Sequence, residues 1–339
     1  MRNETRDSVC AVVVTYNRNE LLLKALDSLL RQQRPVQAIY LIDNASTDNT
    51  PEALIAAGFL DAAPSDDLHD PWERENTVQA EEGGEPCPLF YVRMPTNTGG
   101  AGGFHEGMKR AYERGFQWFW LMDDDVTFYK SALGSMLEYK NVSSLIQPNK
   151  IHFDGTPFHW DGFIDLKFGL QCRTGNIFLK NKEFCFVNRA CFEGMLITRG
   201  VVDQIGFPDP HFFAVGDDTV YGILASEFTN PIYLKEVLAV KQRKENTRRR
   251  SALKRYLMMR NRFFKLRYIK KYPAFSRLAY LFLLFFLGKY LLASVVKEKS
   301  MRNFVAVLRG FKDGMLNIAG REKRFLARIS QKFGLKQNF

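Results

Sequence analysis

The first 50 residues contain two apolar runs with an amphipathic segment between them. Residues 10–17 (CAVVVTYN) begin with a continuous β-branched run and end in polar turn formers, a pattern that predicts a fully buried strand. In residues 18–33, leucine and alanine recur at helical spacing, and Pro35 ends the predicted helix. Residues 37–50 (QAIYLIDNASTDNT) predict a second buried strand that runs into a polar loop. Strand, helix and strand at this spacing form a βαβ unit, hence a parallel sheet with a right-handed crossover.

The same pattern resumes after a polar interruption. Residues 61–88 carry nine acidic side chains against the single Arg74, which predicts a surface insertion or mobile loop rather than core. Residues 88–94 (PLFYVRM) predict the next strand, residues 106–116 (EGMKRAYERGF) a helix, and residues 117–122 (QWFWLM) a further strand. The predicted fold class is therefore α/β, with a Rossmann-like, mostly parallel sheet.

Four polar loops fall at the carboxyl ends of the predicted strands, where open α/β sheets bind their ligands. They are Thr15–Arg18, Asp43–Asp48, Asn97–Gly103 and Asp123–Asp125. The last loop places three adjacent carboxylates behind an apolar strand, where they repel one another and are costly to bury unpaired. A divalent cation with an anionic ligand would balance these charges. The alternative is a solvated strand end without a ligand.

Residues 97–107 (NTGGAGGFHEG) are rich in glycine but match neither common phosphate-binding motif. A dinucleotide fingerprint that begins at Gly100 requires glycine where His105 stands. A P-loop that begins at Gly102 requires lysine where Met108 stands. We expect instead a backbone that approaches a ligand closely, followed by a helix start that favours anions. The alternative is a flexible turn before a helix.

Charge divides the chain into two parts. Residues 235–339 carry 28 Lys and Arg against 5 Asp and Glu, a net charge of +23, whereas the first 234 residues carry 20 against 32, a net charge of −12. We predict an α/β domain over residues 1–235 and a basic, mainly helical region over residues 236–339. The five cysteines form no Cys-x-x-Cys pair, and the polar N-terminus does not resemble a signal peptide. Both features predict a protein on the cytoplasmic side.

The basic region contains one long apolar stretch. Residues 278–296 (LAYLFLLFFLGKYLLASVV) are interrupted by Gly288 and Lys289. Their 19 residues fall just within the range for a spanning helix, but a central lysine costs about 2.5–3.5 kcal/mol on insertion. Since basic flanks lie on both sides, we expect a helix that lies in, or dips into, an anionic cytoplasmic leaflet. The alternative is a buried core helix.

Five segments, in this order, resemble glycosyltransferase family 2 enzymes of GT-A fold. They are VVVTYNR, LIDNASTD, NTGGAGGF, DDD and FEGMLITRGVVDQIGFPDPHFFAVGDDTVYG, and the resemblance covers roughly residues 9–225. The glycine-rich segment and the triple aspartate are most similar to those of bacterial galactofuranosyltransferases, and rhamnosyltransferases are close neighbours. The resemblance implies a nucleotide-diphospho-sugar transferase domain ahead of the basic helical region.

The resemblance also implies which residues hold the donor. In such enzymes, the loop after the first strand and the aspartate after the second hold the base and ribose. The residues expected to bind the nucleotide sugar are Thr15, Tyr16, Arg18, Asp43, Asn97, Gly99, Gly100, Asp123 and Asp124. Asp125 and Asp123 are expected to bind Mg²⁺ or Mn²⁺, since both ions suit oxygen ligands and a diphosphate. The ion would neutralise charge on the departing nucleoside diphosphate.

The GDD segment of residues 216–218 resembles the family's catalytic carboxylate motif. The resemblance implies that Asp218 removes the proton of the attacking acceptor hydroxyl, so that the anomeric configuration inverts. Asp217 would orient the acceptor or the base. The alternative for this pair is an N-cap of the following helix, which does not exclude the catalytic role.

Two positions depart from the family pattern. Val220 stands where an acidic residue is common, and Lys241 and Gln242 stand where a histidine often binds the metal. The metal would then be held by Asp125 and phosphates alone, or a lysine would replace it electrostatically.

The expected function is inverting transfer of galactofuranose from UDP-galactofuranose onto a lipid-linked oligosaccharide of a bacterial surface polysaccharide. The protein would act at the cytoplasmic face of the inner membrane, as a peripheral or monotopic protein of undetermined oligomeric state. A rhamnosyltransferase that uses dTDP-rhamnose is the alternative. Residues 243–255 (RKENTRRRSALKR) also suggest nucleic-acid binding, but their place before the apolar stretch favours lipid, so no nucleic-acid partner is expected. A two-metal phosphohydrolase would need more ligands than Asp217 and Asp218 supply.

Overall fold

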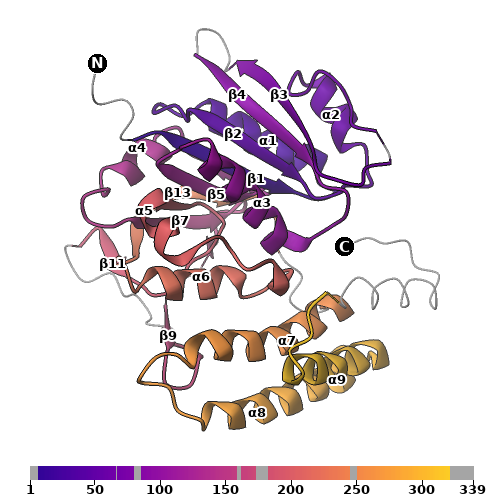
Figure 1. Cartoon of the computed structure of the whole chain (residues 1–339). Coiled ribbons are helices and arrows are strands. Elements are labelled where there is room, and N and C mark those ends of the chain that lie inside the picture. Colours follow the sequence, from indigo (N-terminus) through magenta and orange to yellow (C-terminus); the bar gives the residue numbers. More distant parts are fainter. Residues whose placement is uncertain are drawn as a thin grey trace. The chain divides into compact units, whose positions relative to one another are not determined.

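The computed structural model describes six ranges of the chain, which divide into two compact units (Figure 1). The described ranges are 7–65, 67–79, 85–158, 162–172, 182–244 and 250–320. The first unit comprises Met1–Ile164, Cys172–Pro210 and Asp217–Lys244. The second comprises Asp165–Gln171, His211–Gly216 and Glu245–Phe339. The boundary predicted at residue 235 falls inside a strand of the first unit, because the basic composition begins before that strand ends.

A mixed sheet of 11 strands forms the centre of the first unit. Its strands are β1 (Val9–Thr15), β2 (Ala38–Asp43), β3 (Trp72–Gln79), β4 (Pro86–Arg93), β5 (Trp118–Asp123), β6 (Val126–Phe128), β7 (Leu145–His152), β8 (Pro157–Phe158), β11 (Phe184–Phe186), β12 (Met195–Thr198) and β13 (Ile232–Lys241). The order is β11-β13-β7-β12-β5-β1-β2-β4-β3, with β6 beside β13 and β8 beside β7. β5, β1, β2 and β4 run parallel, as predicted, while β12 and β3 pair antiparallel. β9 (Phe163–Asp165) and β10 (Leu170–Cys172) form a separate two-stranded sheet.

Helices cover both faces of the large sheet (Figure 1). The helices of this unit are α1 (Asn19–Leu30), α2 (Thr50–Ala56), α3 (Gly99–Glu113), α4 (Ala132–Leu137), α5 (Arg199–Ile205) and α6 (Asp217–Ala225). The 3₁₀ helix η1 (Pro210–Phe212) precedes α6, and its last two residues belong to the second unit. Val9, Ala11 and Val13 of β1 pack in one core with Leu22 and Leu26 of α1. The even-numbered residues pack in another core with Phe104 and Met108 of α3. Because both faces of β1 are buried, its sequence is continuously apolar.

Two predicted segments differ in part from the structure. The acidic segment 61–88 is not only a loop, since it contains β3, an edge strand that pairs antiparallel with β4. Four of the eight β3 side chains are exposed, so the strand lacks the apolar alternation that marks a core strand. The helix predicted from residue 106 begins at Gly99, because the glycines form its first turns.

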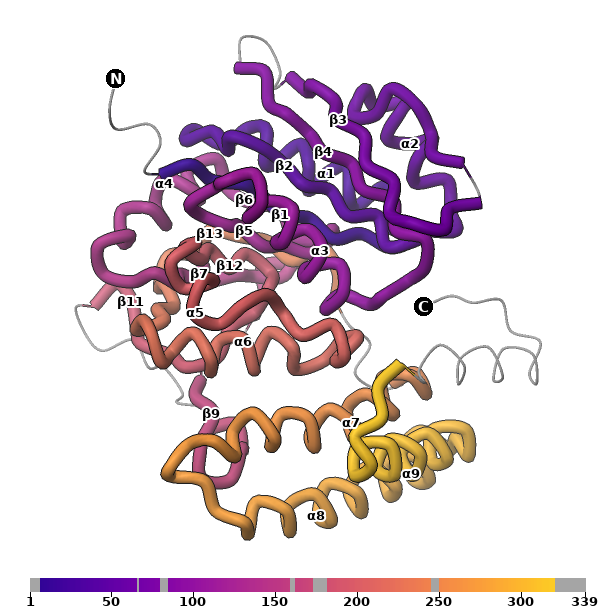
Figure 2. The backbone as a smooth tube through the Cα atoms, viewed as in Figure 1, coloured from indigo at the N-terminus to yellow at the C-terminus, as the bar shows by residue number. Residues whose placement is uncertain are grey.

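The second unit is helical. It contains α7 (Ala252–Ile269), α8 (Ala279–Leu292), a short π-helix η2 (Ala293–Lys297) and α9 (Met301–Met315), which run alongside one another (Figure 2). Gly310 and Gly314 of α9 let it approach α7 closely, since a Cβ at Gly310 would lie 2.4 Å from the Tyr256 carbonyl oxygen. Apolar residues of all three long helices, among them Phe263, Leu283 and Val307, form the core of this unit.

The apolar stretch predicted at 278–296 is helical, as expected, and most of it is not buried. The helix Ala279–Lys297 is long and apolar enough to cross a membrane by length and composition, yet only 22% of its most apolar window is buried. Leu281, Leu284 and Phe285 are 61%, 57% and 61% exposed. This exposure does not fit the alternative of a buried core helix.

Candidate active site

The carboxyl ends of β1, β2 and β5 meet at one edge of the sheet. β1 pairs in parallel with β5, with Val14 opposite Asp123, and with β2, with Thr15 opposite Asp43. The register therefore brings together three of the strand ends from which the polar loops arise. Asp124 and Asp125 form the turn that leads from β5 into β6.

The carboxylate of Asp124 points into the protein and holds the loop after β1. It accepts hydrogen bonds from the Thr15 hydroxyl (2.8 Å), the Tyr16 backbone N–H (3.3 Å) and Arg18 Nη1 (2.7 Å). Asp124 is 1% exposed, and burial raises its pKa although the Arg18 guanidinium opposes the shift. Asp124 thus orders the predicted nucleotide-binding residues Thr15, Tyr16 and Arg18.

Asp125 lies in a buried ion-pair network. Lys241 Nζ lies 2.6 Å from Asp125 Oδ1, 2.5 Å from Glu193 Oε1 and 3.7 Å from Asp123 Oδ2. Arg18 Nη1 lies 3.4 Å from the other carboxylate oxygen of Asp125. The ammonium of Lys241 therefore occupies a point between three carboxylates, whose charges raise its pKa well above the ordinary value despite burial.

The sheet register explains why these residues, which are distant in sequence, lie together. It also explains why the sequence did not predict Glu193 as part of the site. β6 pairs antiparallel with β13, with Val126 opposite Lys241, so Lys241 lies beside the Asp125 turn. β12 pairs antiparallel with β5, and Glu193 precedes β12 at the end where β5 delivers Asp123. A single glutamate before an apolar run is not typical of any functional site. Glu193 could be predicted only by knowing that β12 runs antiparallel to β5.

Asp123 is the most exposed of the three aspartates, with 35% of its side chain accessible. Burial and the charges of Asp125, Glu193 and Asp124 raise its pKa to about 7, although Lys241 opposes this shift. Lys150 Nζ also lies 3.3 Å from Glu193 Oε2, so the four carboxylates of the cluster are paired with the three cations Arg18, Lys241 and Lys150. Among the described residues, no three His, Cys, Asp or Glu side chains gather as a metal site. The residues therefore fit a divalent cation only if an anionic ligand completes its coordination.

Asp43, predicted to contact the nucleotide, is fully buried. Its carboxylate accepts hydrogen bonds from the Tyr91 hydroxyl (2.7 Å), Arg93 Nη1 (2.5 Å) and the Ser46 backbone N–H (2.8 Å). These bonds fix the loop after β2 from three directions. In this conformation, Asp43 shapes the predicted site rather than facing it.

The glycine-rich segment is mainly a packing device. A Cβ at Gly103 would lie 2.6 Å from Val14 Cγ1, and one at Gly107 would lie 2.5 Å from Val12 Cγ1, so both glycines let α3 lie directly on β1. Gly99 adopts a positive φ of 74°, and its N–H donates to Asn97 Oδ1 (2.8 Å). Gly100 has open space around it, so close backbone approach by a ligand is available there.

Asp217 and Asp218 are the first two residues of α6. Asp217 is buried, and Asp218 is half-buried. Burial raises the pKa of both carboxyls; the charge of Asp218 adds to the shift at Asp217, and Arg189 opposes it at Asp218. Asp218 Oδ1 also accepts a hydrogen bond from the N–H of the next residue, Thr219 (2.6 Å). The charge of Asp123 makes a smaller contribution to the raised pKa of Asp217.

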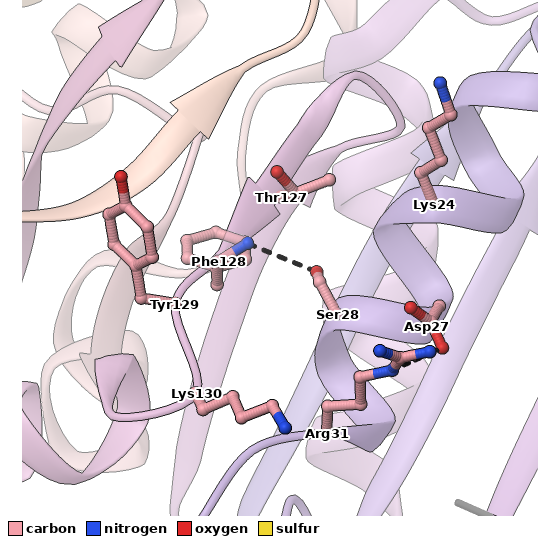
Figure 3. A pocket seen from close by; sticks show the side chains of 8 residues that line it. All are labelled: Lys24, Asp27, Ser28, Arg31, Thr127, Phe128, Tyr129 and Lys130. Carbon is pink, nitrogen blue, oxygen red and sulfur yellow. Dashed lines mark hydrogen bonds and ion pairs between the residues drawn. The ribbon is translucent and has the colours of Figure 1, made fainter. Parts of the chain in front are cut away.

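A shallow cavity of about 360 Å³ lies between α1 and β6 and includes none of the predicted site residues (Figure 3). Arg31 pairs with Asp27 one turn earlier at the end of α1 (2.8 Å). The Phe128 backbone N–H donates to Ser28 Oγ (3.2 Å), and this bond joins β6 to α1. The strand-end carboxylates are therefore the stronger candidate for chemistry.

A comparison with protein families decides the membership of the chain. The model of the family described as "Glycosyl transferase family 2" matches residues 10–58 and 73–206, more than half of the chain. The chain belongs to glycosyl transferase family 2. The matched segments contain Asp43 and the Asp123–Asp125 turn, and they end before Asp217.

Two similar relatives of this family 2 chain carry the name galactofuranosyltransferase GlfT1. The protein of Mycolicibacterium smegmatis is 29% identical over 221 residues, and that of Mycobacterium tuberculosis strain H37Rv is 27% identical over 226 residues. Each match covers 62% of this chain and 62% of the relative, so over a third of each relative has no counterpart in the match.

Solved structures agree on the fold. S. aureus TarS 1–349 has a TM-score of 0.54 at 13% identity, and the match covers 98% of this chain and 93% of that one. The mannosyltransferase PcManGT of Pyrobaculum calidifontis, solved with GDP-Man and Mn²⁺, has a TM-score of 0.51 at 15% identity and covers 98% and 81%. The family 2 chain thus has a GT-A fold followed by a helical region, as predicted.

Proposed function

We propose that this family 2 protein is an inverting glycosyltransferase that moves galactofuranose from UDP-galactofuranose onto a lipid-linked glycan of the bacterial cell envelope. The observation that carries the proposal is the family match over the segment that contains the strand-end aspartates, together with the names of the two relatives. A bound UDP-GlcNAc in one TarS structure of 0.54 TM-score supports a nucleotide-sugar donor.

Asp218 is the proposed base. The acceptor hydroxyl gives its proton to the Asp218 carboxylate, and the acceptor oxygen forms a bond to the anomeric carbon. The bond from that carbon to the diphosphate oxygen breaks, and the nucleoside diphosphate leaves with the electron pair. Attack opposite the leaving group inverts the configuration. Since burial raises the pKa of Asp218 to about 6, the group is mainly deprotonated at neutral pH yet more basic than an ordinary aspartate.

Residues at the edge of the sheet are proposed to hold the donor. Arg18 and Tyr16 belong to the loop that Asp124 fixes, and Gly99 and Gly100 begin α3, whose N-terminal N–H groups favour a diphosphate. Asp123 and Asp125 would hold Mg²⁺ or Mn²⁺ together with that diphosphate. The ion would offset charge on the leaving group. The Mn²⁺ in the PcManGT structure supports this choice.

The exposed apolar face of α8 is proposed to bind the cytoplasmic leaflet of the inner membrane. Leu281, Leu284 and Phe285 are exposed. Arg277 lies two positions before α8, and Lys289 lies in its last turn. Apolar side chains beside cations are the composition that anionic bilayers bind. A lipid-linked acceptor would then be reached at the membrane surface.

The donor is tested with the purified full-length protein. UDP-galactofuranose, UDP-galactopyranose and dTDP-rhamnose are offered with Mn²⁺ or with EDTA, and release of the nucleoside diphosphate is measured. We expect turnover with UDP-galactofuranose that requires the divalent ion. Turnover with dTDP-rhamnose but not with UDP-galactofuranose would contradict the proposed donor. Equal turnover with Mn²⁺ and with EDTA would contradict the proposed metal dependence.

A further inference from the structure

The six residues before the proposed catalytic carboxylates belong to the helical second unit. The segment His211–Gly216 is part of that unit, and the chain continues directly into Asp217 and Asp218 at the start of α6. The segment is conformationally unusual, since Phe213 and Val215 adopt positive φ angles of 63° and 73°. Positive φ is unfavourable for such side chains and persists only where surrounding contacts enforce it.

Asn261 of α7 supplies many of those contacts. Its side-chain amide nitrogen donates to the backbone oxygens of Phe212 (3.0 Å), Ala214 (2.7 Å) and Val215 (2.9 Å). One amide group thus joins three carbonyls of a single loop. Asn261 is 4% exposed, so water cannot readily replace these bonds.

Arg260 holds the same loop from the preceding position. Its Nη2 donates to the backbone oxygens of His211 (2.9 Å) and Phe212 (2.8 Å), and its Nε donates to Asn261 Oδ1 (2.9 Å). The last bond orients the Asn261 amide with its nitrogen towards the loop. The Phe212 ring packs against the Phe264 ring of the same helix, with ring centroids 5.7 Å apart.

We propose that Asn261 and Arg260 are positioning residues for the carboxylates of α6. They hold residues 211–216 in the strained conformation that leads into α6, and so they fix where the chain enters this helix at Asp217 and Asp218. The helical unit then serves catalysis as well as attachment. The claim rests on the proposed function insofar as Asp218 is the base, whereas the loop restraint itself does not depend on that assignment.

Asn261→Ala is the test, and Asn303→Ala is its matched control. Asn303 lies in α9 of the same unit, is 5% exposed, and donates its amide to the Arg250 carbonyl oxygen and to Glu298. Both variants remove a buried amide from the helical unit, but only Asn261 bonds the loop before Asp217. Full-length proteins are compared by donor affinity, kcat, KM and hydrogen–deuterium exchange of peptides that cover residues 211–218.

We expect faster exchange in residues 211–218 and a kcat lowered about 10–100-fold in Asn261→Ala, with donor affinity unchanged. Asn303→Ala is expected to keep both kcat and the exchange rate of that peptide. Wild-type exchange and kcat in Asn261→Ala, or equal losses in both variants, would overturn the proposal. If Asn261→Ala does not fold, Arg260→Lys, which removes the planar fork, is expected to give the same pattern, and wild-type exchange there would contradict it. Asp218→Asn with normal turnover would refute the base assignment alone.

Discussion

Lys241 carries a fixed positive charge where the family pattern leads one to expect a metal-binding histidine. Its contacts with Asp125 and Glu193 are short and buried, so the lysine balances carboxylates that would otherwise be costly to keep ionised. Burial by itself would raise the pKa of Glu193. The positive charge of Lys241 is the largest of the opposing effects, and together they lower this pKa to about 2. A resident cation of this kind lets the cluster fold before donor or metal arrives.

Lys241→Ala should therefore destabilise the protein by up to about 3–5 kcal/mol at pH 7, because it removes the nearest cation from the buried carboxylates of Asp125 and Glu193 and leaves them only the longer contacts with Arg18 (3.4 Å) and Lys150 (3.3 Å). The pKa of Glu193 is lowered from 4.5 to about 2, so its contribution to stability is complete well above pH 4.5 and is lost as the pH falls from about 4.5 to 2. The difference between Lys241→Ala and the wild type should therefore shrink over that range, which urea unfolding at pH 7 and at about pH 2 measures. The control is Lys235→Ala on the same strand, whose exposed pair with Glu183 (3.7 Å) should contribute about 0–1 kcal/mol. Equal effects of the two variants would contradict the role of Lys241.

Single residues were predictable where a motif carried the signal. The aspartate triplet pointed to a charged strand end because three carboxylates in sequence are unusual after a buried strand. Glu193 was not predictable, because its meaning depends on β12 reversing beside β5. The inward turn of Asp43 and Asp124 was equally hidden, since the sequence does not reveal that Tyr91 and Thr15 are their partners.

At the scale of elements, hydrophobic periodicity predicted β1, α1, β2, β4 and β5 because each is long and strongly patterned. It missed β3, because this edge strand has mostly exposed, charged side chains and therefore lacks the apolar alternation of a strand that faces a core. It also placed the start of α3 at residue 106 instead of Gly99, because glycine is a poor helix former and a glycine-rich segment is more typical of a loop. Close packing on β1 explains that exception.

Gly107→Ala should destabilise the protein by about 1–3 kcal/mol, because the new methyl group would lie 2.5 Å from Val12 Cγ1 and 2.8 Å from Ile42 Cγ1. Gly100→Ala is the matched control in the same helix. No atom lies within 4 Å of a Cβ there, so the substitution should change stability by less than about 1 kcal/mol, in the stabilising direction. Thermal and urea unfolding of both variants decide the matter. A tolerated Gly107→Ala would mean that α3 can move off the sheet.

At the scale of the whole molecule, the sequence predicted two parts from charge alone, and two compact units are present. It did not predict that His211–Gly216 belongs to the helical unit. That assignment depends on hydrogen bonds between residues almost 50 positions apart, which leave no periodic trace.

Membrane attachment through α8 is expected to be separable from folding. The triple variant Leu281→Asp, Leu284→Asp and Phe285→Asp places charges on side chains that are already exposed, so unfolding should change little. Binding to vesicles with anionic phospholipid should fall at least about tenfold, since the apolar contact is lost and anionic lipid repels the new charges. Phe228→Asp, at a 51% exposed residue of the first unit, is the control in a vesicle sedimentation assay. Unchanged sedimentation of the triple variant would place the attachment elsewhere.

The central claim is that Asp218 accepts the acceptor proton in an inverting sugar transfer. The most direct measurement compares Asp218→Asn with the wild type, for UDP affinity by calorimetry and for sugar transfer to acceptor. Asparagine keeps the size of the side chain but removes its basicity, so UDP affinity should stay within about twofold while transfer falls about 10²–10⁴-fold. Near-wild-type transfer by Asp218→Asn would contradict the account.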